Sequence, residues 1–197
     1  MALGVFFVLA AVCLCQQAQA QSLTWEIMLS REGRTKEYIQ PIPQTIQGVN
    51  YDIFQINIKT ASDCFCYAVF YDSEENVAQG FDKPPRFIQP MKGGEEAIIK
   101  FEISGSGTDT VFVIMSLKRQ EKLESLIQAY NRNPDTQRQK DIYLEVINLQ
   151  NIARGLGTPT TKPIISGGTS RGGGNSENNA TEYSDKDLYV RAISIRH

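Results

Sequence analysis

Residue types that carry out catalysis are sparse in this chain. It contains a single histidine, His197, at the last position of the sequence. A Ser-His-Asp or Cys-His mechanism would have to use this residue as its base, and a chain end holds a base poorly. The three glycines at 172–174 do not follow a predicted strand, so they do not match a phosphate-binding loop. We therefore expect neither enzyme activity nor a cofactor.

The carboxylates leave two kinds of chemistry open. The acidic turn formed by Asp72, Glu74 and Glu75 has oxygen ligands that could hold Ca²⁺, but it also fits the solvated tip of a hairpin, which we favour. Glycoside hydrolysis needs two facing carboxylates. The chain has 22 Asp and Glu residues, and nothing in their spacing singles out a pair. A carboxylate-dependent hydrolase is therefore only a third choice, and no metal site is predicted.

The cysteines favour packing over chemistry. Cys64 and Cys66 stand two apart in a predicted strand, so both side chains point to the same face and a disulfide between them would be strained. A lone Cys-x-Cys pair is a weak metal motif because structural zinc usually takes four ligands. We interpret the pair as two buried, small apolar residues.

The beginning of the chain has the pattern of a signal peptide. The run Ala2–Cys15 has no charged side chain and is too short for a membrane-spanning helix, which needs about 20 residues. Ala18-Gln19-Ala20 then matches a signal-peptidase site. We expect residues 1–20 to be removed, Gln21 to become the first residue, and the protein to be periplasmic or secreted without a stable membrane span.

Two alternatives exist for this segment. It could be a buried N-terminal helix, although its position and the cleavage-like site argue for a signal peptide. Lipid anchoring at Cys13 or Cys15 is not favoured, because the preceding residues are Val12 and Leu14 instead of small residues.

The charge balance argues against nucleic acid as a partner. The chain has 20 Lys and Arg residues and 22 Asp and Glu residues, and the sequence shows no basic cluster. Nucleic-acid binding and membrane-surface binding both normally need such a cluster.

Aromatic residues in predicted loops offer a candidate binding surface. Phe81 and Phe87 flank Pro84 and Pro85, which would stiffen the loop between the rings. We take Phe81, Pro84, Pro85 and Phe87 as a possible binding loop. In the alternative and commoner arrangement, the rings fold back as a small core beneath the loop.

Periodicity predicts a mainly β chain with two late helices. Alternation of apolar and polar residues is typical of half-buried strands, and Cys64–Tyr71, apolar on both parities, predicts a central strand covered on both faces. The predicted strands are Leu23–Leu29, Asp52–Lys59, Cys64–Tyr71, Val77–Phe81, a short piece at Phe87 and Ile88, Ala97–Ile103, Thr110–Leu117 and Leu188–Ile195.

The spacing of apolar residues changes to a helical period after residue 120. Leu123, Leu126, Ile127 and Tyr130 predict one amphipathic helix. Asn133-Pro134-Asp135 predicts a cap and a proline in the first turn of a second helix. This helix carries Ile142, Val146 and Leu149 on one stripe and should end near Gly155.

We therefore expect an antiparallel β-sandwich decorated by two helices after the fifth or sixth strand. Residues 21–155 would form the domain, and the Gly-, Ser-, Thr- and Asn-rich segment 156–184 would be flexible. Residues 185–197 would return as a C-terminal strand of the same sheet, or be donated to a partner's sheet. The broken alternation at Arg191-Ala192 suggests a bulge or an edge position.

The segment from about Tyr51 to Gln120 resembles the family catalogued as domain of unknown function 4384. The similarity lies in the aromatic strand and Asp-Ser turn at 65–73, the strand at 99–103, the turn Gly105–Asp109 and the strand at 111–116. The resemblance implies a β-rich accessory domain, often in exported bacterial proteins, without established catalytic residues.

These observations lead to a non-enzymatic interaction module that binds a protein partner in the cell envelope. A β-sandwich that binds a small ligand or a glycan is the alternative.

Overall fold

The computed structural model describes residues 23–32, 36–39, 44–49, 51–72, 77–79, 88–103, 105–164 and 180–197. These residues form two β-sheets and two helices. The predicted signal peptide and Gln21 lie outside the described residues. Neither of the two helices in the described part of the chain is long and apolar enough to cross a membrane.

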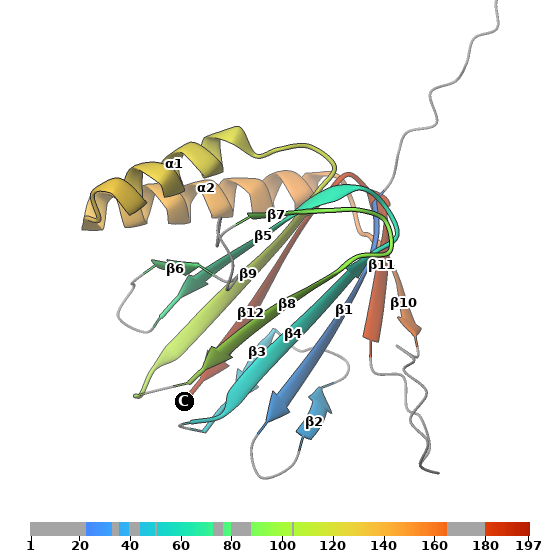
Figure 1. Ribbon diagram of the computed structural model, residues 1–197, viewed down its shortest axis with the longest axis horizontal. Helices are drawn as coiled ribbons and strands as arrows, with labels where there is room; N and C mark the ends of the chain where they lie inside the picture. Colours follow the sequence, from blue (N-terminus) through green and yellow to red (C-terminus); the bar gives the residue numbers. More distant parts are fainter. Residues whose placement is uncertain are drawn as a thin grey trace, which may run out of the picture.

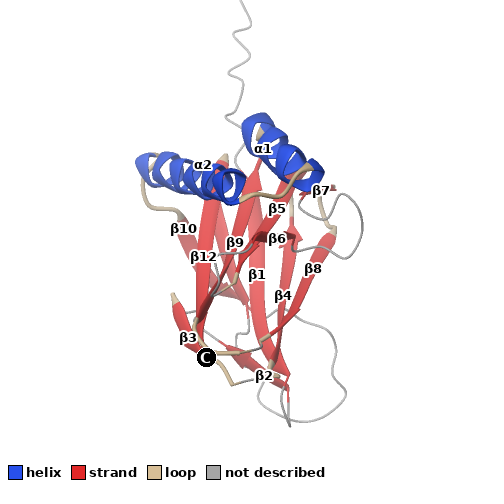
Figure 2. Cartoon of the chain, turned by 90° about the vertical axis from the view of Figure 1, so that its left-hand side faces the viewer, coloured by secondary structure: helices blue, strands red, loops and turns tan. Residues whose placement is uncertain are grey.

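The two sheets face each other, and both helices cover the outer face of the second one (Figures 1 and 2). The first sheet contains β1 (Leu23–Glu32), β2 (Lys36–Ile39), β4 (Ile53–Thr60), β8 (Glu96–Glu102), β10 (Thr160–Ile164) and β11 (Ala180–Lys186). The second contains β3 (Thr45–Gln47), β5 (Cys64–Tyr71), β6 (Val77–Gln79), β7 (Ile88–Met91), β9 (Thr108–Ser116) and β12 (Leu188–Arg196). The helices are α1 (Glu121–Arg132) and α2 (Thr136–Gly155).

This architecture confirms the predicted fold class of a mainly β chain with two helices and a returning C-terminal strand. In the described part of the chain, however, nine strands precede the helices, where five or six were expected. The difference comes mainly from short strands such as β3, which has only three residues, too few for its alternation to stand out in the sequence. Pairing is antiparallel except between β3 and β12, which run parallel.

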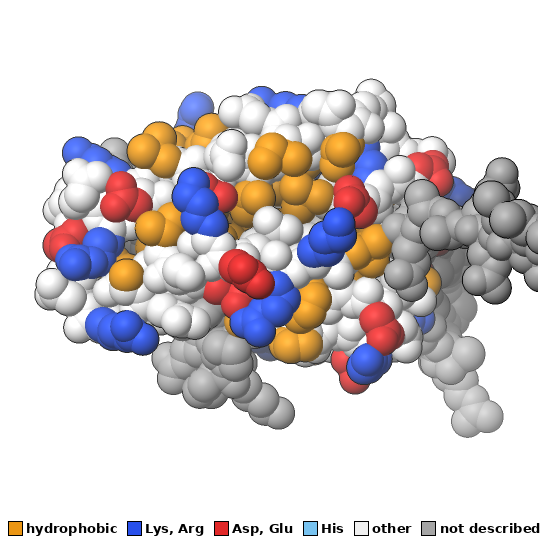
Figure 3. Space-filling model, turned by 90° about the horizontal axis from the view of Figure 1, so that it is seen from above, with side chains coloured by type: hydrophobic (Ala, Val, Ile, Leu, Met, Phe, Trp, Pro, Cys, Tyr) orange, Lys and Arg blue, Asp and Glu red, His pale blue; other side chains and the backbone are white. Residues whose placement is uncertain are grey.

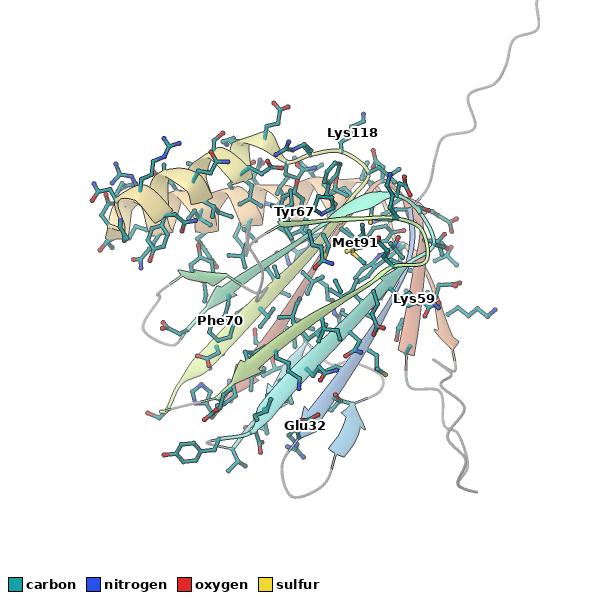
Figure 4. The ribbon with its side chains drawn as sticks, in the orientation of Figure 1. Glu32, Lys59, Tyr67, Phe70, Met91 and Lys118 are labelled. Carbon is teal, nitrogen blue, oxygen red and sulfur yellow. The ribbon has the colours of Figure 1, made fainter. Side chains whose placement is uncertain are left out.

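The layers enclose two apolar cores. The core between the sheets contains Trp25, Phe54, Ile99 and Ile193, and the core between the second sheet and the helices contains Tyr67, Ile114 and Leu123. In Figure 4, Tyr67 lies beneath the helices, whereas Phe70 and Met91 lie toward the space between the sheets. β5 contributes alternate residues to both cores, as expected of a strand covered on both faces.

Cys64 and Cys66 are buried in the core between the sheets and are not joined in a disulfide. Burial raises the pKa of both thiols, most strongly for Cys66. The prediction that they are packing residues is confirmed.

The C-terminal strand docks into the chain's own sheet. β12 pairs with β9 in an unbroken register from Leu188 to Arg196. The predicted bulge at Arg191-Ala192 is therefore wrong, whereas the alternative of an edge position fits, because among the described strands β3 pairs with β12 only from Ser194 to Arg196. The alternation looks broken because both faces of β12 are covered, so Leu188, Val190 and Ala192 pack toward the helices while Tyr189 and Ile193 enter the core between the sheets.

Two further expectations need correction. The segment 156–184 is not one flexible loop, because its ends form β10 and β11, which pair with each other, and β11 also pairs with β1. Residues 165–179 lie outside the described part of the chain. The cap of α2 is Asp135, whose side chain accepts a hydrogen bond from the amide of Arg138 at 2.7 Å. α2 ends at Gly155, as predicted, and the glycine with positive φ that follows the helix is Gly157, at +93°.

Candidate functional site: a groove beneath helix α2

Helix α2 presents two neighbouring stripes to the rest of the molecule. The first is the predicted apolar stripe of Ile142, Val146 and Leu149, which is buried against the second sheet. The second stripe borders a groove of about 460 Å³ between α2 and the sheet. Its members are Thr136, Gln139, Lys140, Tyr143, Ile147, Gln150 and Arg154. Their spacing of three or four residues places them along one side of the helix.

The floor of the groove is the outer face of β9 and β12. Thr108 and Thr110 come from β9, and Ser194 comes from β12. The hydroxyl oxygens of Thr110 and Ser194 lie 3.1 Å apart, within hydrogen-bond distance. Each hydroxyl can both donate and accept, so the floor offers hydrogen bonds of either kind to a ligand.

Three aromatic rings form an apolar wall. The rings of Tyr71 and Tyr143 meet edge to face at 5.4 Å between centroids, and Phe112 packs edge to face on Tyr71 at 6.1 Å. The Tyr71 hydroxyl donates a 3.0 Å hydrogen bond to the carbonyl of Gln139, which joins β5 to α2. Burial raises the pKa of Tyr71, so it stays neutral and keeps this donor. The side chain of Tyr143 is left 44% exposed at the groove.

Two cations border the groove. Lys140 and Arg154 lie 14 positions apart on α2, about 21 Å at 1.5 Å per residue. Neither forms an ion pair with another residue in the described part of the chain. Of the described residues that line the groove, Asp72 is the single carboxylate, so they supply no facing pair for glycoside hydrolysis.

A second cavity of about 370 Å³ adjoins the groove near the C-terminal end of α2. Gln150 and Arg154 line both spaces, so the two follow the same helix. Seen from the helix side, apolar patches alternate with charged side chains across this face of the molecule (Figure 3).

Helix α1 is held differently, through a buried polar network instead of an open groove. The hydroxyl of Tyr67 donates a 2.8 Å hydrogen bond to Glu124, and the amide of Gln120 donates to that hydroxyl at 2.7 Å. Arg119 pairs with both carboxylate oxygens of Glu124. This arginine keeps the pKa of Glu124 below its usual value, because its hydrogen bonds favour the ionised form. The network fixes the start of α1 on β5.

The residues predicted as site residues fall in three places. Phe81, Pro84, Pro85 and Phe87 lie outside the described residues, as do Glu74 and Glu75 of the acidic turn. Asp72 lines the groove. Within the described part of the chain, no group of three or more His, Cys, Asp or Glu residues is arranged to hold a metal ion.

His197 is more ordered than a chain end was expected to be. Its backbone pairs with Gly107, and its ring nitrogen Nε2 lies 3.2 Å from the carboxylate of Asp109. Its Nδ1 lies 3.2 Å from the carbonyl oxygen of Gly105. Both ring nitrogens thus lie against groups of the fold, and the pair secures the end of β12.

The sequence did contain a signal for the groove. Along β9, the residues that face the helices change from Thr108 and Thr110 to Phe112 and Ile114. Such a change within one strand face indicates that the cover above it is incomplete at the polar end. The distant residues Tyr143 and Ser194 could not have been joined to this pattern without the strand order.

Comparisons of the chain with protein-family models, with curated proteins and with solved structures found no match. The resemblance to the family of domain of unknown function 4384 therefore stays a prediction.

Proposed function

We propose that this chain is an exported, non-enzymatic interaction module whose groove beneath α2 binds an extended segment of a protein partner in the cell envelope. The observation that carries the proposal is the composition of the groove. An aromatic wall, a hydroxyl floor and two cations without ion-pair partners among the described residues surround one space of about 460 Å³. Binding sites commonly combine an apolar lining with a few polar groups in this way.

The shape of the site favours a chain over a compact ligand. The groove-facing stripe of α2 runs from Thr136 to Arg154, about 27 Å at 1.5 Å per residue. Arg154 and Gln150 then continue it into the second cavity. An extended peptide of about eight residues covers a similar length.

Each part of the groove matches one part of a peptide. An apolar or aromatic side chain can pack on Tyr143 and Phe112, whose rings gain from burial and from edge-to-face contact. The hydroxyls of Thr110 and Ser194 and the amides of Gln139 and Gln150 can bond its backbone. Lys140 and Arg154 would favour acidic side chains and speed their approach.

A selection from a random peptide library against the purified protein tests this proposal. We expect the enriched peptides to combine an aromatic or large apolar residue with Asp or Glu. Tyr143→Ala should weaken binding of such a peptide by tenfold or more, measured by fluorescence anisotropy, because it removes the exposed ring of the wall. Lys140→Gln should weaken it less and should reduce its dependence on salt.

The matched control for the ring is Leu144→Ala. Leu144 is the next residue of α2, is 62% exposed and does not line the groove. Its replacement should leave the affinity unchanged. Equal losses of affinity in Tyr143→Ala and Leu144→Ala, or a loss in Leu144→Ala alone, would show that the peptide binds outside the groove.

Photo-crosslinking tests the partner class in its own compartment. A photoreactive residue at position 143 should crosslink a protein of the cell envelope, whereas the same residue at Ile98, on the exposed face of the first sheet, should not.

Export is tested by N-terminal sequencing of the protein recovered from the envelope, and the sequence should begin at Gln21. Recovery from the cytoplasm with Met1 retained would contradict export.

A glycan is the second candidate ligand, because exposed aromatic rings beside amide and hydroxyl side chains also suit sugars. A neutral glycan would bind without help from Lys140 and Arg154. A signal on a glycan array that is lost in Tyr143→Ala but unchanged in Lys140→Gln would favour it over the peptide.

A further inference from the structure

The cavity near the C-terminal end of α2 has a different chemistry from the groove. Its volume is about 370 Å³, and it lies where β1 and β11 of one sheet face β12 of the other. Trp25, Tyr183 and Tyr189 form its aromatic side, and α2 with the turn after it closes the opposite side. This arrangement places a rigid aromatic cluster against the end of the helix.

The indole of Trp25 holds a buried donor without an acceptor. Trp25 is 1% exposed, and its Nε1 has no hydrogen-bond partner in the described part of the chain. Buried polar groups nearly always have a partner, and the N–H of a buried tryptophan usually finds one. The ring cannot turn easily, because Tyr183 stacks on it at 5.0 Å and Tyr189 meets it edge to face at 5.7 Å.

The cavity is also positively charged. Arg154, Lys186 and Arg191 line it, and no carboxylate does so among the described residues. The ammonium of Lys186 donates to the carbonyl oxygens of Ala153, at 2.8 Å, and of Gly157, so its role is to cap the end of α2. Arg191 has an interaction of its own within the chain, whereas Arg154 has no ion pair with a described residue, so Arg154 is the cation that remains available to a ligand.

We propose that this cavity binds a carboxylate group. The indole N–H of Trp25 donates to one of its oxygens, and the guanidinium of Arg154 neutralises the charge. A carboxylate has only acceptors, so it satisfies the indole without leaving a donor of its own unpaired. Its two oxygens also match the planar donor pair of an arginine.

The carboxylate has two possible sources, a small organic acid or an acidic group of the segment bound in the groove. The second source rests on the proposed function, because Arg154 and Gln150 line both spaces. Binding of a free carboxylate does not depend on the groove being a peptide site.

Trp25 reports on its own site because it is the only tryptophan in the chain. The ¹⁵N-labelled protein therefore shows one indole N–H signal in a two-dimensional NMR spectrum. Titration with sodium acetate should move this signal in a saturable way, toward the position typical of a stronger hydrogen bond. Sodium chloride at the same ionic strength should not move it.

Variants separate the cavity from the groove and from general charge effects. Arg154→Gln should weaken the acetate response about tenfold. Arg132→Gln removes an exposed cation in the last turn of α1, away from the cavity, and should leave the response unchanged. Tyr143→Ala should weaken peptide binding in the groove by tenfold or more but leave the acetate response intact, so failure of one proposal is distinguishable from failure of the other.

A peptide with an acidic end and its amide-capped version distinguish the two sources. If the acidic peptide moves the indole signal more than acetate does and the amide does not, the carboxylate comes from the bound segment. If acetate alone moves the signal, the ligand is a small organic acid. An indole signal unmoved by acetate, moved equally by chloride, more sensitive to phosphate than to acetate, or equally responsive in Arg154→Gln would overturn the assignment.

Discussion

The outer face of the second sheet is covered in two different ways. Under α1 the cover is closed, since Leu123 and Ile127 are fully buried against β5 and β9, and the polar groups of Tyr67 and Glu124 pair with each other. Under one side of α2 the cover is open, and Tyr143 is left half-exposed above the hydroxyls of β9 and β12. One half of this sheet face is thus fully covered, and the other half is left partly open.

The largest effect should come from removing β12, the strand that pairs with β9 along its whole length and forms part of the groove floor. Deleting residues 185–197 takes away β12 and the buried side chains of Leu188, Tyr189, Ile193 and Ile195. Each is worth about 1.5–3 kcal/mol, so their sum approaches the whole stability of a typical domain. We expect the truncated protein to lose its cooperative thermal transition by circular dichroism. An unchanged melting temperature would contradict docking of β12 within the chain.

The two halves should lose different amounts of stability when a side chain is removed. Leu123→Ala, in the closed half, should lower the free energy of unfolding by about 2–5 kcal/mol, because it leaves a cavity. Tyr143→Ala, in the open half, should lower it by about 1 kcal/mol or less. Urea denaturation of the two variants measures both values. A cost for Tyr143→Ala as large as that for Leu123→Ala would mean that the groove is part of the core.

The closed half also predicts a dependence on pH. The pKa of Glu124 is lower in the folded protein than its ordinary value of 4.5. The ionised carboxylate therefore contributes stability that is complete above about pH 4.5 and is lost as the pH falls through the folded pKa. Glu124→Gln should cost about 1–2 kcal/mol at neutral pH, and the cost should shrink in acid. Urea denaturation at pH 7 and pH 3.5 measures this change, and a cost that does not vary between them would refute the ionic role of Glu124.

The smallest effect concerns the start of α2, which positions the groove. Asp135→Ala removes the side chain that caps the helix and should cost about 1 kcal/mol. Asp141→Ala removes a partly buried carboxylate of the same helix that accepts a hydrogen bond from Gln137 but does not cap the helix; it serves as the control and should cost less. Thermal melts of both variants provide the comparison, and a larger loss for Asp141→Ala would show that the cap does not hold the helix.

The closed half was largely predictable from the sequence, and the open half was not. The spacing of Leu123 and Ile127 along α1 reports their burial directly, because helix periodicity is local. The groove instead joins residues far apart in the chain, such as Thr110 and Ser194, through the pairing of β9 with β12. Several pairs of consecutive strands also lie in different sheets, such as β4 and β5 or β8 and β9. Adjacency in the sequence therefore did not reveal the order of the strands within each sheet.

The C-terminal part of the chain also forms contacts that its local sequence does not predict. The composition of 156–184 predicts flexibility, yet its ends pair as β10 and β11 because β1 offers an edge for them. Tyr183 on β11 then stacks on Trp25, which creates the aromatic side of the second cavity. No local pattern could have indicated that contact.

Mapping a bound peptide by NMR tests the division of the sheet most directly. A library-selected peptide should move the backbone amide signals of Thr110, Tyr143 and Ser194 and leave those of Leu123 and Ile127 in place. Signals that move mainly along α1, or on the exposed face of the first sheet around Ile98, would contradict the division into a closed half and a binding half.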